Sequence, residues 1–326
     1  SVVLPETVMT IDFRAFSSCR SLTGIVVPEG ITSIDFWAFS GCISLGNISL
    51  PSTLTSIGQS AFAHCSALTS IDIPEGVTSI GNSAFSGCSS LTSIVIPEGV
   101  TSIGWSAFQN CSSLTTIALP STLTSVGSNA FSSCTAFTSI VIPEGVTRIG
   151  HRAFQGCSSL TSISLPSTLT SIGDYAFEGC YALTSIDIPE GVTSVGNSAF
   201  SGCSSLTSIV IPKGVTTIGD WAFQGCSSLT TISLPSTLTS IGNSAFWGCH
   251  ALTSIDIPEG VTSIGGGTFG YCESLTSVTL PSTLTTIEGN PFVGCKSLSD
   301  LSIAAGNTSF VVEEGVLYDT GKTRVI

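Results

Sequence analysis

The sequence is poor in charged side chains, and basic ones are the scarcest. Only 9% of its 326 residues are charged, and 21 acidic against 8 basic side chains give a net charge of −13. Such a chain repels phosphate groups and has no cluster of Lys or Arg to neutralise them. This balance argues against nucleic-acid binding and against adsorption to anionic membranes.

Long apolar segments are also missing, although hydrophobic residues make up 42% of the chain. No run approaches the roughly 20 residues that a helix needs to cross a bilayer, so we expect no membrane insertion. No signal peptide is visible, because Ser1 already lies inside a repeat. We therefore expect a processed or trimmed start, with the targeting signal missing from this chain.

A recurring set of catalytic residues is absent as well. His64, His151 and His250 lie far apart, and none stands at a fixed distance from a carboxylate and a nucleophile. Catalysis needs a convergent, preorganised group of side chains. No CxxC or Cys/His spacing suits a metal ion. We predict that the protein is not an enzyme and that it uses no cofactor or metal.

What the chain does contain is a strict repeat of 23 residues. Phe85 belongs to a column of thirteen phenylalanines at this step, and Cys88 belongs to a column that uses all thirteen cysteines, from Cys19 to Cys295. A constant period in the range of 20–50 residues predicts a solenoid. Because the number of cysteines is odd and their spacing uniform, we interpret them as a buried ladder of unreactive thiols and not as a disulfide framework.

One repeat contains three recognisable segments. LTSIVI (residues 91–96) has apolar residues at strand spacing and predicts a short strand that ends at Pro97. VTSIG (residues 100–104) predicts a second extended piece, and SAFQNC (residues 106–111) predicts one helical or 3₁₀ turn. We expect about thirteen such coils over residues 1–303, followed by an irregular closing hairpin over residues 304–326.

The turn after the first strand occurs in two versions. Most coils carry PEG, with PKG at Lys213, and the others carry PST at Pro51, Pro120, Pro166, Pro235 and Pro281. The intervals of 69, 46, 69 and 46 residues define a larger unit of 115 residues. We interpret this longer period as the result of duplication. The glutamates of PEG line one edge, where a solvated role competes with calcium coordination by Glu75 and Glu98.

The repeat LxxIxIPxxVxxIGxxAFxxC resembles the BspA-like class of leucine-rich repeats, and GVLYDTGKTRVI resembles the closing segment of that family. The resemblance covers nearly the whole chain. It implies a curved leucine-rich-repeat solenoid, a β-rich right-handed superhelix with parallel strands on its concave face. It also implies a secreted or surface-displayed protein, usually one that takes part in adhesion. The family shares no catalytic or ligand motif, so no site residue is transferred.

Large or charged side chains depart from the Ser/Thr-rich consensus at a few surface columns. Exposed aromatics are enriched in recognition surfaces, whereas neutral drift of surface positions is the alternative. Three aspartates on the first-strand face are further candidates. The candidate partner-binding residues are Trp37, Trp105, Tyr175, Glu178, Tyr181, Trp221, Trp247, His250, Asp72, Asp187 and Asp256.

Two functions remain open at this stage. The first is a surface or secreted adhesion module that binds an extracellular protein or glycan through a repeated face, by many weak contacts. The second is a structural protein, either a rigid spacer or a unit that joins copies of itself end to end into fibres. Sequons at Asn47, Asn110 and Asn307 leave glycosylation open. The sequence does not identify the partner, the organism or the assembly state.

Overall fold

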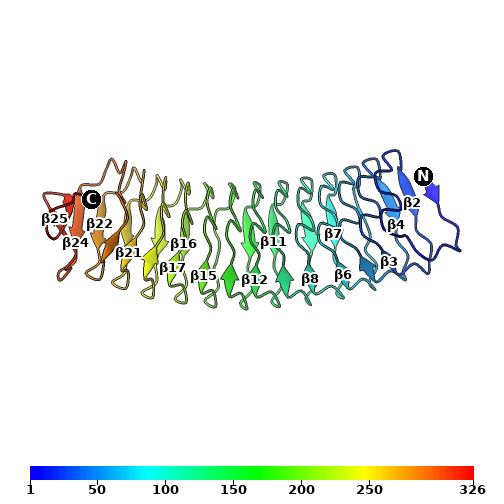
Figure 1. Cartoon of the computed structure of the whole chain (residues 1–326), viewed down its shortest axis with the longest axis horizontal. Coiled ribbons are helices and arrows are strands. Elements are labelled where there is room, and N and C mark those ends of the chain that lie inside the picture. Colours follow the sequence, from blue (N-terminus) through cyan, green and yellow to red (C-terminus); the bar gives the residue numbers. More distant parts are fainter. The chain divides into compact units, whose positions relative to one another are not determined.

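A computed structural model describes residues 1–326 and divides the chain into two compact units, Ser1–Thr168 and Leu169–Ile326. In each unit the backbone winds through successive coils whose strands lie side by side (Figure 1). Each full coil contributes a first strand from the LTSIVI segment, a second strand from the VTSIG segment, or both. The predicted fold class is confirmed, because the chain is a parallel β-solenoid of about 13 turns.

The first unit contains the strands β1 to β13. Its first strands are β1 (Val2–Val3), β2 (Gly24–Val26), β4 (Asn47–Ser49), β7 (Ser93–Val95), β9 (Thr116–Ala118), β11 (Ser139–Val141) and β13 (Ser162–Ser164). Its second strands are β3 (Ser33–Ile34), β5 (Ser56–Ile57), β6 (Ser79–Ile80), β8 (Ser102–Ile103), β10 (Ser125–Val126) and β12 (Arg148–Ile149).

The second unit contains the strands β14 to β26. Its second strands are β14 (Ser171–Ile172), β15 (Ser194–Val195), β17 (Thr217–Ile218), β19 (Ser240–Ile241), β21 (Ser263–Ile264) and β23 (Thr286–Ile287). Its first strands are β16 (Ser208–Val210), β18 (Thr231–Ser233), β20 (Ser254–Asp256), β22 (Ser277–Leu280) and β24 (Asp300–Ile303). An antiparallel hairpin follows, formed by β25 (Phe310–Glu313) and β26 (Val316–Asp319).

The two kinds of strand differ in how far their ladders extend. Within each unit the second strands form one uninterrupted parallel sheet, with partners 23 residues apart, such as Ser102 and Ser125. The first strands instead form separate groups of two or three. Near Asp72 and Asp187 no first strand is formed at all. The short VTSI segment, and not LTSIVI, therefore supplies the longer ladder.

The core is made of stacked columns of identical side chains. Phe39, Phe62 and their equivalents are fully buried, and neighbouring rings within a unit lie 5.2–5.6 Å apart with nearly parallel planes. The Cys column lies beside them, and its buried thiols donate to phenylalanine carbonyls of the preceding coil, as Cys88 does to Phe62 at 3.1 Å. No disulfide forms. Identical coils bury identical surfaces against each other, so each coil depends on its neighbours for stability.

The segment around each Ala-Phe pair differs from the predicted helical turn. Cys88 donates its N–H to the carbonyl of Phe85 (3.1 Å), whereas the N–H of Phe85 donates to Ala107 in the next coil (2.8 Å). Ser83 and Gly87 have φ values of 55° and 73°. Two left-handed residues within five positions prevent a right-handed helix. The segment is a series of tight turns, and half of its N–H groups bond to the neighbouring coil.

The PEG and PST versions of the turn form hydrogen bonds with each other in neighbouring coils. In a PST coil that follows a PEG coil, the serine donates its N–H and hydroxyl to the preceding glutamate, as Ser121 does to Glu98 at 2.8–3.3 Å. Thr122 also donates to the carbonyls of Glu98 and Val100. In a PEG coil, a Cβ on Gly99 would lie only 2.9 Å from the Val77 carbonyl of the coil before it. The two versions of the turn thus have a structural role, and their origin by duplication stays an interpretation.

Asn307 fixes the start of the closing segment. Its side-chain nitrogen donates to the carbonyls of Pro281, Ser282 and Leu284 at 2.9–3.2 Å. Its oxygen accepts two backbone N–H groups at 2.8 Å. A glycan on this nitrogen would displace these bonds. In the folded protein the Asn307 amide is therefore engaged in hydrogen bonds and is not free to carry a glycan. The division into an array over residues 1–303 and a closing domain over residues 304–326 stays a prediction.

Candidate binding groove

The variable side chains of each coil stand on the tight turns around Ala-Phe. The residue before Ala is left-handed in most coils, including Trp37, Tyr175 and Trp221, with φ values of 54–57°. The residue two positions after Phe forms a second left-handed column, which is mostly glycine. Bulky residues rarely adopt this conformation and do so at a cost in free energy. The turn thus fixes the direction in which each of these side chains leaves the backbone, at constant intervals along the stack.

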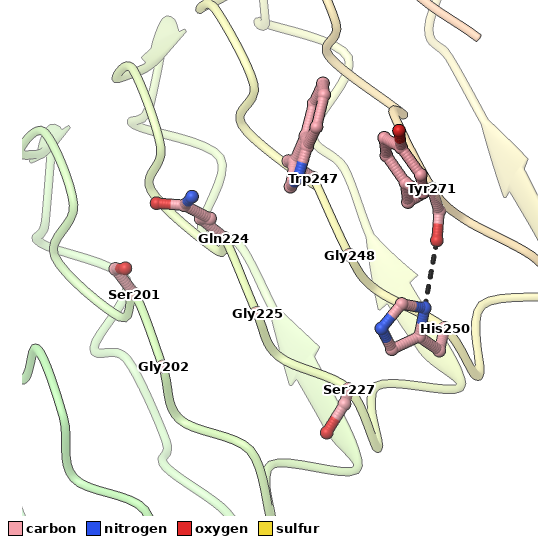
Figure 2. Close-up of a pocket in the computed structure, with 9 residues that line it drawn as sticks. All are labelled: Ser201, Gly202, Gln224, Gly225, Ser227, Trp247, Gly248, His250 and Tyr271. Atoms are coloured by element: carbon pink, nitrogen blue, oxygen red, sulfur yellow. Dashed lines mark hydrogen bonds between the residues drawn. The ribbon is translucent and has the colours of Figure 1, made fainter. Parts of the chain in front are cut away.

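A groove lies along these turns in the second unit, with a volume of about 570 Å³. This size falls within the roughly 300–1,000 Å³ that is typical of small-molecule sites. Gly202, Gly225 and Gly248 form its floor, and two aromatic rings stand at one end (Figure 2). The groove is lined by Ser201, Gly202, Gln224, Gly225, Ser227, Trp247, Gly248, His250 and Tyr271.

Trp247 is held in place by glycines of the next coil. A Cβ on Gly270 would lie 2.3 Å from the indole ring, and one on Gly267 would lie 3.0 Å from it. Most coils carry Ser or Gln at the position of Gly270, and Ser or a larger residue at that of Gly267. The half-buried indole therefore occupies space that only this coil leaves open. The Tyr271 ring packs beside it, with ring centres 4.9 Å apart and planes tilted by 51°.

His250 forms the other side of this end of the groove. Its Nδ1 lies 3.0 Å from the backbone carbonyl oxygen of Tyr271 (Figure 2). A carbonyl only accepts, so Nδ1 carries the proton and Nε2 of the neutral ring is an acceptor. Nε2 lies 4.0 Å from the point where a Cβ on Gly248 would stand, so it is turned towards the groove floor.

The electrostatics of the groove are neutral. No Asp, Glu, Lys or Arg is among the lining residues. Just outside, Glu273 and Lys296 form an ion pair at 2.7 Å. The Lys296 ammonium lowers the pKa of Glu273, and the same contact raises the pKa of Lys296. The two charges compensate each other, so neither provides a net charge for a ligand.

The structure brings some predicted site residues together and leaves others apart. Trp247 and His250 line the groove, and the ring of Tyr181 lies 3.5 Å from the Cβ position of Gly202. Tyr175 and Glu178 lie in the same coil as the Phe177 core ring and are half-buried. Their role in binding stays a prediction.

The remaining candidates lie elsewhere. Asp72, Asp187 and Asp256 are exposed on the first-strand face and do not line the groove. Trp105 and Trp221 are exposed, at 66% and 42%. In the first unit, Trp37 is half-buried and packs with Phe13 and Phe36, while the Arg14 guanidinium lies over two of these rings. For Trp37 the structure therefore provides a local packing role.

The sequence interpretation missed Tyr271 and the glycine floor. Tyr271 replaces glycine in the left-handed column and has a φ of 55°. It occurs in the same coil as Gly267 and Gly270, two further departures from the consensus. Three departures from the consensus repeat within one coil were the feature of the sequence that could have revealed this site. Only the contact with Trp247 of the preceding coil explains them.

A second hollow, of about 730 Å³, lies on the first-strand face of the first unit. Its lining is rich in hydroxyl groups, with Thr116, Ser139 and Ser164 around the exposed Val141. None of the candidate aromatic or aspartate residues lines it. Its glutamates, Glu98 and Glu144, are already bonded to serines of the next coil.

Comparison with known families supports the repeat assignment. The description "BspA type Leucine rich repeat region (6 copies)" matches residues 1–104, 78–207, 124–250 and 193–314. The chain belongs to this BspA-type family. A search of curated proteins finds no significant match. The structure has no helix that could span a membrane.

Solved structures of bacterial leucine-rich repeat proteins resemble this chain over most of their length. A leucine-rich repeat protein from Bacteroides ovatus is 34% identical, with 92% of this chain and 86% of that chain covered and a TM-score of 0.77. A leucine rich cell surface protein from Faecalibacterium prausnitzii is 33% identical, with 93% and 87% covered and a TM-score of 0.63. A leucine-rich repeat protein from Eubacterium ventriosum is 26% identical, with 86% and 84% covered and a TM-score of 0.57.

Proposed function

We propose that this BspA-type protein is a non-enzymatic binding module, displayed on a cell surface or secreted, that recognises an extracellular protein or glycan. One observation carries the proposal. Trp247 departs from the consensus in one coil, and the next coil lacks the side chains at Gly267 and Gly270 that would collide with it. Independent drift of surface residues does not produce such a fit. The similarity to a cell surface protein supports the location.

The groove has the properties of a recognition surface. It combines two aromatic rings with an imidazole, an amide and two hydroxyl groups. Tyr and Trp contribute large contact areas at recognition sites. Tyr271 stands at a left-handed backbone position, and Trp247 packs against Gly267 and Gly270 of the next coil. Both rings are therefore held before binding, which reduces the entropy lost on association.

The proposal is tested with two arrays of equal length. One is the natural chain, and in the other every coil carries the consensus residues at the variable columns. Both are passed over immobilised extracellular-matrix proteins and glycans. We expect a partner that the natural array retains and the consensus array loses. Equal binding by both arrays, or none by either, would contradict recognition through the variable residues.

The alternative is a structural role as a spacer or fibre unit. The uniformity of the coils favours it, since residues 51–165 and 166–280 align copy for copy. Uniform coils need no variable groove, however. Retention of a partner by the natural array alone would favour the binding role over the structural one.

A further inference from the structure

We propose that the groove at Trp247, His250 and Tyr271 is a binding site for a neutral oligosaccharide. This inference rests on the proposed binding function and narrows it to one class of ligand. The groove is open along the row Gly202, Gly225 and Gly248, so a linear chain of sugar units can lie across successive coils (Figure 2).

The aromatic end of the groove suits a sugar ring. The C–H groups on one face of a pyranose carry a slight positive charge and pack against the negative face of an aromatic ring. Trp247 and Tyr271 are tilted by 51° to each other, so they present two differently oriented faces at the same end. Gly267 and Gly270 leave room for the indole, so its position does not depend on the ligand.

The polar groups of the groove suit hydroxyl groups. The Gln224 amide and the Ser201 hydroxyl offer both donors and acceptors. Ser227 donates its hydroxyl to the Ser204 carbonyl at 3.4 Å, so it offers an acceptor. Nε2 of His250 adds an acceptor, because Nδ1 donates to the Tyr271 carbonyl. A sugar hydroxyl donates and accepts at once, so it can pair with each of these groups. The absence of ionic side chains from the lining favours an uncharged ligand over a sulfated or sialylated one.

The backbone of the floor argues against an extended peptide as the ligand. Peptides that add a strand need a row of unpaired backbone N–H and C=O groups. Here the N–H groups of Gly202, Gly225 and Gly248 already donate to the next coil at 2.7–2.8 Å. The carbonyls of Gly202 and Gly225 accept from residues two positions later. Recognition therefore has to use side chains.

Two substitutions remove the site while preserving the fold. Tyr271→Gly removes a ring and places glycine at a left-handed position, so it relieves backbone strain. Gly225→Asn fills the floor, and Asn110 holds the same column at a φ of 60°, so the backbone accepts this residue. Gly156→Asn is the matched control, because Gly156 occupies the same column in the first unit and its added Cβ would make only ordinary contacts.

The experiment is a titration with neutral hexasaccharides of glucose (maltohexaose, cellohexaose, laminarihexaose) and of mannose, followed by calorimetry and tryptophan fluorescence. A hyaluronan hexasaccharide is the acidic comparison. We expect at least one neutral sugar to bind and the acidic one to bind more weakly. Tyr271→Gly and Gly225→Asn should each weaken binding about tenfold, while Gly156→Asn leaves it unchanged and all three variants stay folded.

Three results would overturn the inference: no binding by any neutral sugar, equal binding by wild type and the two groove variants, or preference for the acidic sugar. If sugars fail while the natural array still retains a protein that the consensus array loses, the proposed function stands and only the saccharide assignment is wrong. If neither ligand class is retained, both are wrong.

Discussion

At the residue scale, the columns show which side chains stabilise the stack and which do not. Each buried cysteine donates to a carbonyl of the preceding coil, and burial raises the pKa of the Cys111 thiol to about 12. Cys19 differs, because it is exposed in the first coil. The sequence-based expectation of a uniformly buried ladder of cysteines is therefore wrong for Cys19.

This difference predicts how the native protein reacts with a thiol reagent such as Ellman's reagent. The thiolate is the reactive form, so thiols with a raised pKa and no solvent access react slowly. We expect one fast thiol in the native state, slower reaction of the half-buried Cys295, and reaction of the others only on unfolding. Cys19→Ser should abolish the fast phase. Rapid labelling of several thiols in the Cys19→Ser variant would contradict the burial of the column.

Trp105 interrupts a ladder of hydrogen bonds that Asn and Asp side chains form from coil to coil. In several coils an Asn or Asp at this position accepts the N–H of its counterpart in the next coil, as Asn82 does from Trp105 at 2.9 Å. In the second unit, four successive bonds of this kind span 2.6–2.9 Å. An indole has no acceptor to continue the ladder to Ser128.

We therefore expect Trp105→Asn to stabilise the protein by about 0.5–1 kcal/mol, the usual net value of an exposed hydrogen bond. Urea unfolding measures the change. Trp105→Leu is the control, because leucine has nearly the shape of asparagine without its oxygen. Equal stability of the Asn and Leu variants would show that the ladder does not extend to Ser128.

At the scale of the element, the two kinds of turn act as a pair. The hydroxyl and N–H of Ser121 lower the pKa of Glu98, and backbone and side-chain hydrogen bonds from Ser52 lower the pKa of Glu29. A carboxyl group with a lowered pKa in the folded state stabilises that state above its unfolded pKa. This contribution is lost as the pH falls through the folded pKa, so the relevant window lies below the ordinary value of 4.5.

We expect the melting temperature of the wild-type protein to fall on acidification from pH 5 to pH 3. Glu98→Gln should reduce this fall, because it removes one of the groups that titrates. Glu75→Gln is the matched control: the coil after Glu75 carries PEG, which has no serine to donate. Thermal melts at several pH values measure the effect. An equal change in both variants would argue against a special role for the Glu–Ser pair.

At the scale of the whole molecule, family membership and the groove favour recognition over self-assembly. A net charge of −13 on a chain with only 8 basic side chains makes copies repel each other. We expect the 33.3 kDa chain to sediment as a monomer over a wide range of concentration in moderate salt. Particles that lengthen as the concentration rises would instead support the fibre alternative.

The sequence by itself determined the period, the core columns, the two extended segments of the repeat and the family. It could do so because every coil meets its neighbours at the same offset of 23 residues, so one repeat predicts the register of all the others. The side chains at Phe85 and Cys88 have equivalent surroundings in almost every coil, and local spacing was enough to place them.

Only the tertiary structure decided the features that depend on differences between adjacent coils. The left-handed turns replaced the predicted helical turn, because half of their N–H groups bond to the next coil and the left-handed residues interrupt a helix. The pairing of Glu98 with Ser121, and the fit of Trp247 over Gly270, join residues 23 positions apart. Spacing places such residues in neighbouring coils, but contact between them depends on which way each turn points its side chains.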